Sequence, residues 1–208
     1  MLSKLRDYIL VNHSSLFWRY RHLIDRNWTD GYLNEEALNN PHRNLIVETL
    51  KKYAPFRDLV EYGCGAGANL IKIHESMPDV NLTGIDISKK AVRVAEQNLK
   101  YAIFYHGDVR SFFAGTHQRR DVVLTDAVLI YVPPECMRSI QCAFMGIADK
   151  VIVMCEWHSD KGPFVAFGHH IHNYRKVFPG CEITKIPKDV WPGGGWEKYG
   201  SMIVWKRP

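Results

Sequence analysis

A glycine-rich run preceded by an acid is the feature of this sequence best suited to bind a ligand. Residues 61–67 (EYGCGAG) follow a short apolar segment and lead into a helical pattern. Glycines in such a turn let the backbone bend tightly and approach a ligand closely, while the start of the next helix offers free amides. Asp86 ends the following apolar segment, 23 residues after Gly63, where an acid can accept hydrogen bonds from ribose hydroxyls. This spacing predicts a site for a nucleoside-bearing cofactor.

The position of the acid distinguishes between two cofactor classes that use this geometry. Dinucleotide sites carry G-x-G-x-x-G and place a pyrophosphate on the helix N-terminus. Here the third glycine, Gly67, comes one residue early, and Glu61 lies two residues before the first glycine. A carboxylate at that place would repel a pyrophosphate but suits an ammonium group, such as that of S-adenosylmethionine. We therefore expect S-adenosylmethionine to bind and NAD not to bind.

Strand patterns alternate with helical patterns along most of the chain. This alternation predicts βαβ units and a mainly parallel sheet with right-handed crossovers. Near-continuous apolar strands favour a doubly wound α/β fold, in which helices cover both faces of the sheet. No crossover helix fits between the last two strands, so we expect them to be antiparallel. The expected strands are 58–62, 81–86, 102–106, 121–125, 151–155, 181–186 and 201–205; the expected helices are 41–53, one ending near 77, one capped by Ser88, one opened by Pro133-Pro134, and 168–178.

The first 40 residues differ from the rest. They are aromatic and polar with apolar residues at roughly helical spacing, so we expect a helical N-terminal appendage over 1–40 and the main domain over 41–208. Trp18, Arg19, Tyr20 and Trp28 could form a lid over a cationic, adenine-bearing ligand. They could equally pack the appendage against the core.

The motifs in this order resemble the class I S-adenosylmethionine-dependent methyltransferases. The resemblance rests on VEYGCGAG, LTGIDIS, FYHGDV and DVVLTDAVLIYVPPE, and it covers about residues 41–208. It implies a seven-stranded sheet whose last strand is antiparallel, and S-adenosylmethionine as the cofactor. The stretch VLIYVPPE also looks like the small-molecule branch of the family, which includes sugar-modifying and antibiotic-modifying members.

The resemblance also implies roles for the residues that begin the domain. The loop would hold the methionine and ribose parts of the cofactor. Asp86 would bind the ribose hydroxyls, and Ile87 would lie beside the adenine. The loop positions that match the family pattern are Glu61, Gly63, Gly65 and Gly67.

Two further pairs match the family pattern at the ends of the next strands. Asp108, with Val109, would meet the adenine amino group. Asp126 and Ala127 would face the methionine moiety.

The acceptor is expected to be a small molecule. Nucleobase amino-methyltransferases carry an Asn or Asp directly followed by Pro-Pro and an aromatic residue after the fourth strand. Here Asp126 is followed by Ala127, and Pro133-Pro134 lies further downstream, which makes a nucleic-acid partner less favoured. The alternatives are a nucleic-acid or protein methyltransferase, and a domain that binds the cofactor without turnover.

A general base near the fifth strand is the next expectation, since methyl transfer to a hydroxyl or protonated amine must release a proton. His158 follows that strand and titrates near neutral pH. His170 and Tyr174, on the expected helix 168–178, are the substitutes. The neighbouring histidines, with Cys155 and Glu156, have metal-ligand types, but His169 and His172 would share a helix face without His170, so no metal is expected.

Composition limits the class of protein. The 208 residues are 46% hydrophobic and 24% charged, which is enough for one domain with its own core. The formal charge of +5 could favour an anionic partner, but the basic residues are scattered. Five cysteines without a C-x-x-C pair indicate a reducing compartment. No run is apolar for the roughly 20 residues of a membrane span, so a cytoplasmic location is expected.

Overall fold

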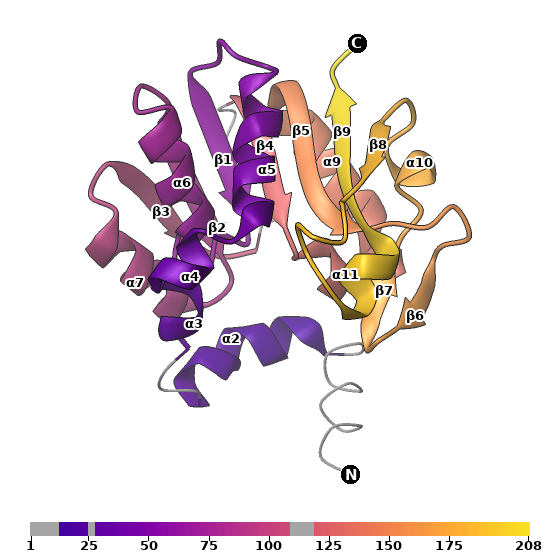
Figure 1. Cartoon of the computed structure of the whole chain (residues 1–208), viewed down its shortest axis with the longest axis horizontal. Helices are drawn as coiled ribbons and strands as arrows, with labels where there is room; N and C mark the ends of the chain where they lie inside the picture. The colour runs from indigo at the N-terminus through magenta and orange to yellow at the C-terminus, as the bar shows by residue number, and fades with distance from the viewer. Residues whose placement is uncertain (1–12, 25–27, 109–118) are drawn as a thin grey trace.

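A seven-stranded sheet forms the centre of the molecule (Figure 1). The computed structural model describes residues 13–24, 28–108 and 119–208. The strands lie in the order β3-β2-β1-β4-β5-β9-β8. Their bounds are β1 Asp58–Tyr62, β2 Asn81–Asp86, β3 Ala102–His106, β4 Arg120–Asp126, β5 Ala148–Trp157, β8 Glu182–Lys185 and β9 Gly200–Lys206.

The directions of the strands agree with the sequence patterns. Strands β1 to β5 pair in parallel, while β9 pairs antiparallel with both β5 and β8. The predicted α/β fold, a mainly parallel sheet whose last strand is antiparallel, is therefore confirmed. Because parallel strands end at one edge, Tyr62, Asp86 and Asp126 lie at the same end of the sheet.

Helices cover both faces of the sheet, because neighbouring residues of each strand face opposite ways. In β1, Leu59 belongs to the core on the side of α5, α6 and α7, whereas Val60 belongs to the core with α9. Ser88 caps α7 as expected, since its side chain accepts a hydrogen bond from the amide of Ala91. The helices of these layers are α5 Pro41–Lys51, α6 Ala68–Ser76, α7 Lys89–Asn98, α9 Met137–Ile147 and α10 Tyr174–Val177, with 3₁₀ turns η1 Leu129–Tyr131 and η2 Pro134–Cys136.

The N-terminal part of the chain is helical where it is described. Helix α2 (Ser14–Ile24) lies across the end of the sheet at which β1 and β4 finish (Figure 1). Two short helices, α3 (Asp30–Leu33) and α4 (Glu35–Leu38), then lead to α5. Asn40 caps α5 by accepting a hydrogen bond from the amide of His42, and Pro41 is its first residue, as the sequence predicts.

The predicted helix over 168–178 is wrong in its first half. Residues His169–Ile171 form strand β7, which pairs antiparallel with β6 (Phe164–Ala166) in a separate hairpin. The chain turns between them at Phe167, with φ of 52°, and Gly168, with φ of 72°. Only the short α10 remains of the expected helix. A second departure is α11 (Gly194–Tyr199), a helix within the segment expected to be a loop between the last strands.

No helix in the described ranges is long and apolar enough to cross a bilayer.

Candidate active site

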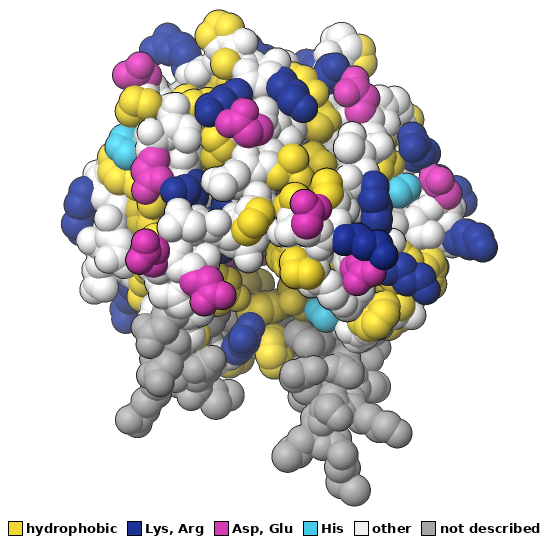
Figure 2. All heavy atoms as spheres, in the orientation of Figure 1, with side chains coloured by type: hydrophobic (Ala, Val, Ile, Leu, Met, Phe, Trp, Pro, Cys, Tyr) yellow, Lys and Arg dark blue, Asp and Glu magenta, His cyan; other side chains and the backbone are white. Residues whose placement is uncertain are grey.

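A cavity of about 640 Å³ opens at the carboxyl ends of the parallel strands. Its volume is in the range of small-molecule and cofactor sites. The loops after β1, β2 and β4 form most of its wall, and residues at the start of α2 close one side. Figure 2 shows a hollow between α2 and the body of the domain, with hydrophobic side chains on its walls. Parallel α/β sheets bind ligands at this edge.

The glycine loop forms the floor of this cavity. Gly63, Gly65 and Gly67 all have positive φ, at 74°, 55° and 88°. The amides of Gly63 and Cys64 donate to the carbonyl of Ile85, at 2.7 and 3.1 Å, which ties the loop to β2. Gly63 and Gly65 line the cavity, whereas Gly67 lies outside its lining and caps α6. The turn therefore needs glycines for its backbone conformation.

Asp86 links the glycine loop to the next helix. Its Oδ2 accepts from the Gly65 amide at 2.9 Å, and its Oδ1 accepts from the Ser88 amide at 2.7 Å. Burial raises the pKa of Asp86, although these two hydrogen bonds oppose the shift. The carboxylate lines the cavity together with Ile87. Each oxygen has a second lone pair, so Asp86 can still accept ribose hydroxyls.

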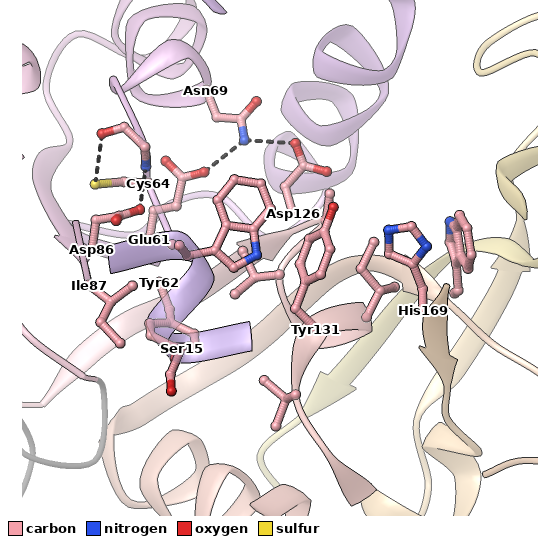
Figure 3. A pocket seen from close by; sticks show the side chains of 18 of the residues that line it. Ser15, Glu61, Tyr62, Cys64, Asn69, Asp86, Ile87, Asp126, Tyr131 and His169 are labelled. Carbon is pink, nitrogen blue, oxygen red and sulfur yellow. Dashed lines mark hydrogen bonds between the residues drawn. The ribbon is translucent and has the colours of Figure 1, made fainter. Parts of the chain in front are cut away.

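Two buried carboxylates line the cavity beside the glycine loop and share one amide (Figure 3). Nδ2 of Asn69 donates to Oε1 of Glu61 at 2.7 Å and to Oδ2 of Asp126 at 3.0 Å. The second oxygen of each acid, Oε2 of Glu61 and Oδ1 of Asp126, is buried without a hydrogen-bond partner in the described residues. A buried acceptor left unpaired costs about 1–3 kcal/mol. The pair is therefore suited to a ligand that carries hydrogen-bond donors, above all a cation.

The two acids differ in protonation. Burial raises the pKa of Glu61 to about 8. Burial also opposes ionisation of Asp126, but His42 and Arg43 outweigh it and lower the pKa of Asp126. At neutral pH the pair thus carries one negative charge, on Asp126. A cationic ligand would favour ionisation of Glu61 as well.

Two basic residues of α5 support this pair, and sequence reasoning missed both. Nη1 of Arg43 donates to Oδ1 of Asn69 at 2.5 Å, which fixes the amide so that its NH₂ faces the acids. Nε2 of His42 lies 3.3 Å from Oδ2 of Asp126. Only the fold brings α5 to the end of β4. The capped helix start at Asn40 locates the helix in the sequence, but no signal there indicates that His42 and Arg43 reach the acids.

The remaining predicted cofactor residues come from the ends of β3 and β4. Asp108, Asp126 and Ala127 line the cavity. Ala127 has a φ of 56°, uncommon for a residue with a side chain, and its amide donates to the carbonyl of Cys155 at 3.0 Å. Val109 lies outside the described residues. The cofactor contacts of these residues stay predictions.

A buried acid, which the sequence suggested only as a possible metal-ligand type, holds the loop after β4. Glu156, in β5, accepts hydrogen bonds from the amides of Val128 and Leu129, both at 3.0 Å, and of Ile130 at 3.3 Å. Its Oε1 also accepts from the Thr125 hydroxyl at 2.9 Å. Burial raises the pKa of Glu156 to about 7. This acid is a positioning residue, since its bonds fix the segment that carries Ala127 to Tyr131.

The other end of the cavity is aromatic. The ring of Tyr131 lies 4.8 Å from Trp18 of α2 and 4.9 Å from His169 of β7, between centroids. His169 in turn lies 4.8 Å from Trp157. Trp196 contacts Trp157 edge-on at 5.7 Å. Trp18 thus lines the cavity and packs on the loop after β4 at the same time, and its role as a lid stays a prediction.

The three predicted base residues do not line this cavity. Two contacts hold the His158 ring away from the cavity. Its Nδ1 accepts a hydrogen bond from the Tyr174 amide at 3.3 Å, and its Nε2 lies 3.3 Å from Oδ1 of Asp160. Tyr174 is fully buried in the core. His170 faces away from the cavity side of β7, because it stacks with His172 at 6.0 Å. The geometry therefore gives no support to His158, His170 or Tyr174 as the base.

The histidines also do not share the faces expected of a helix. In the strand, His170 and His172 lie on one side and His169 on the other, since residues of a strand alternate. Nε2 of His172 donates to the carbonyl of Leu129 at 3.0 Å, and burial lowers the pKa of His172 to about 4. Within the described part of the chain, no three His, Cys, Asp or Glu side chains are grouped so as to hold a metal ion.

Comparison with known proteins identifies the family. Residues 58–189 match the methyltransferase-domain family, and the chain belongs to it. Release factor glutamine methyltransferases of Bacillus cereus and Bacillus anthracis are 31% identical to it over 120 residues. That stretch is 52% of this chain and 42% of each relative, so the chain spans less than half the length of the curated relatives it matches.

Solved structures share the fold over nearly the whole chain. The N-methyltransferase NodS of Bradyrhizobium japonicum WM9, with S-adenosylhomocysteine, superposes with a TM-score of 0.70 at 17% identity, covering 90% of this chain and 95% of that one. The magnesium protoporphyrin IX methyltransferase ChlM of Synechocystis PCC 6803, with S-adenosylmethionine, gives 0.64 at 18% identity, covering 99% and 97%. The plantazolicin methyltransferase BpumL, with S-adenosylhomocysteine, gives 0.67 at 14%, covering 100% and 99%. These matches confirm the class I methyltransferase fold that the motifs predicted.

Proposed function

We propose that this protein transfers a methyl group from S-adenosylmethionine to a small molecule. One observation supports the cofactor above the others: two buried carboxylate oxygens, on Glu61 and Asp126, lack partners beside a glycine loop. The methionine ammonium of S-adenosylmethionine would supply donors to both. Asp86 would then accept the ribose hydroxyls from the adjoining end of the cavity. The bound S-adenosylmethionine or its product in the solved relatives agrees with this assignment.

The chain's own residues would bind and orient the two reactants. When bound, S-adenosylmethionine supplies an electrophilic methyl group on its sulfonium. Asn69, fixed by Arg43, would hold Glu61 and Asp126 in place for the ammonium. The loop that Glu156 anchors would place the aromatic end of the cavity next to the methionine end. Holding two reactants together in this way is worth effective molarities of ~10⁵–10⁸ M.

A small acceptor is favoured because α2 covers the aromatic end. His13, Ser15 and Trp18 line the cavity, and Trp18 packs against Tyr131. A free small molecule fits such an enclosed space, whereas a side chain presented by a folded protein would have to displace α2. The solved relatives named for a porphyrin and for plantazolicin act on molecules of this kind. All five cysteines are free thiols, which supports a reducing, cytoplasmic location.

A protein acceptor is the second candidate, favoured by the likeness to release factor glutamine methyltransferases. A single labelling experiment separates the two. The full chain is incubated with S-adenosylmethionine labelled in its methyl group and with a cell extract divided into small-molecule, protein and nucleic-acid fractions. We expect label in the small-molecule fraction. Label in the protein fraction would establish the second candidate, and binding without transfer to any fraction would show a non-catalytic cofactor-binding domain.

A further inference from the structure

We propose that the aromatic end of the cavity binds a planar aromatic hydroxyl compound and that His169 is the base that removes its proton. This inference rests on the proposed methyl transfer and gives it a substrate class. The arrangement of Tyr131, Trp157 and His169 supports it, as does the hydrogen bond that fixes the His169 ring.

The rings at this end contact one another and line the cavity. His169 lies 4.9 Å from Tyr131 and 4.8 Å from Trp157, between centroids, and Figure 3 shows it beside Tyr131. Trp18 contacts Tyr131 in turn, at 4.8 Å. Aromatic rings prefer offset-stacked and edge-to-face partners at 4.5–7 Å. A flat aromatic ligand can therefore make more favourable ring contacts with this wall than an aliphatic ligand of the same size.

The charged side chains of the cavity lining lie at its other end, near the glycine loop. The charged side chains among the described residues of the lining are Arg43, Glu61, Asp86, Asp108 and Asp126, all on the glycine loop, α5 or the ends of β2, β3 and β4. The aromatic end presents few polar groups. A sugar would bring several hydroxyls there without partners, at about 1–3 kcal/mol for each one buried. An aromatic ring with one or two oxygens would not.

One buried donor at this end also points to a ligand oxygen. Trp157 is 4% exposed, and its indole Nε1 has no hydrogen-bond partner in the described ranges. Its ring is held tightly, because Gly195 of α11 leaves no room for a side chain against it. An oxygen on the acceptor ring would accept this hydrogen bond.

The tautomer of His169 suits it to act as a base. Nδ1 of His169 lies 2.6 Å from the carbonyl oxygen of Phe167. A carbonyl only accepts hydrogen bonds, so Nδ1 carries the proton, and Nε2 of the neutral ring is the basic nitrogen. The hydrogen bond comes from the tight turn at Phe167, which fixes the ring as well as its tautomer. Such a second-nitrogen contact is the usual way in which a protein orients a histidine.

The proposed step balances. The hydroxyl oxygen forms a bond to the methyl carbon as the carbon–sulfur bond breaks, with that bond's electron pair left on the sulfur. The hydroxyl proton moves to Nε2 of His169, which later returns it to water. A positioned base of this kind contributes ~10²–10⁴-fold to the rate.

The test uses 4-nitrophenol, whose absorption distinguishes the phenol from the phenolate. Its binding to the full chain is titrated across pH in the presence of S-adenosylhomocysteine, alongside cyclohexanol, N-acetylglucosamine and choline. We expect 4-nitrophenol to bind about tenfold or more tightly than the three other probes. Bound to the wild-type chain it should ionise at lower pH than in solution. In His169→Gln this shift should disappear while the affinity for S-adenosylhomocysteine stays the same.

His170→Gln is the matched control, because it changes the next residue of the same strand on the side away from the cavity. It should leave the ionisation of the bound probe unchanged. Tighter binding of N-acetylglucosamine or choline would overturn the substrate class, and an unchanged shift in His169→Gln would overturn the base. If His169→Gln does not fold, the wild-type shift decides alone, since a bound probe that ionises as in solution refutes the base. Failure of S-adenosylhomocysteine to bind would refute the proposed function separately, as calorimetry on the wild-type chain would show.

Discussion

Replacing Glu61 with glutamine should stabilise the folded chain at neutral pH and weaken its cofactor binding. Glu61 is 1% exposed, and burial raises its pKa from the ordinary 4.5 to about 8. As the pH rises from 4.5 to about 7, the unfolded chain releases this proton while the folded chain keeps it. The folded state is therefore favoured at low pH and loses stability as the pH rises. At 1.36 kcal/mol per pH unit, the loss is about 3 kcal/mol at pH 7, and glutamine does not incur it.

The assay is urea unfolding of both chains at several pH values. A shift in the midpoint with an unchanged slope measures stability alone. We expect the two chains to be alike near pH 4.5 and Glu61→Gln to gain steadily above it. Glu135→Gln is the control, because Glu135 is an exposed carboxyl on η2 and should follow the wild-type chain at each pH.

The same variant tests the cofactor assignment in the opposite direction. An ammonium group next to Glu61 would favour its ionised form, so binding should release a proton below pH 8 and tighten as the pH rises. Glu61→Gln should lose this pH dependence and bind S-adenosylmethionine more weakly, by about 1.5–3 kcal/mol for the charged hydrogen bond. Calorimetry in buffers of different ionisation enthalpy measures both effects. This account of Glu61 would be refuted if the unfolding free energies of the wild-type chain and Glu61→Gln changed in parallel with pH and if both chains bound S-adenosylmethionine equally tightly.

Three further substitutions test separate parts of the structure. Asp86→Ala should weaken S-adenosylmethionine binding by about 1.5–3 kcal/mol per charged hydrogen bond lost; unchanged calorimetric affinity in a folded variant would place the ribose elsewhere. Gly63→Ala should cost about 1–3 kcal/mol of unfolding free energy, because its φ is 74° and the added Cβ would overlap Val128; Gly31→Ala, which meets nothing within 4 Å, is the control. His172 is neutral when folded, because burial lowers its pKa from 6.5 to about 4. Its stabilising effect is therefore present above pH 6.5 and falls by about 3 kcal/mol towards pH 4. His172→Asn should lose that dependence in acid unfolding followed by circular dichroism, and a curve like the wild type would contradict it.

The sheet could be predicted because its strands are short apolar runs bounded by glycine, proline and polar residues. The expected strands 81–86 and 102–106 coincide with β2 and β3. The capped helix after Ser88 was equally clear, since a cap acts within one turn. Such signals are local, so a single sequence contains them.

The hairpin β6–β7 was missed because the spacing of His169, His170 and His172 matches neither the period of a helix nor that of a strand well. What decides the structure there is the turn at Phe167, whose positive φ no sequence rule predicts for phenylalanine. The error carried over to the site. In a helix His170 was a fair substitute base, but in a strand the alternation turns His169 to the cavity instead.

The glycine loop and Asp86 could be found because their spacing is fixed by one βαβ unit. Arg43 could not, since its contacts with Asn69 and Asp126 join segments far apart in the chain. The role of Glu156 was equally hidden, because its partners are backbone amides of a distant loop. Nearly every residue type has such an amide, so the sequence of the loop does not indicate the contact.

The contact between α2 and the loop after β4 has a consequence for how the chain assembles. Trp18 is made early in synthesis, but Tyr131, on which it packs, follows only after four strands of the sheet. Helix α2 therefore has no complete docking place on a growing chain, and closing of the cavity belongs to the last stage of folding. A ligand that fills the cavity would stabilise only the finished molecule. Its binding to newly made protein would thus report how much of the chain has completed its fold.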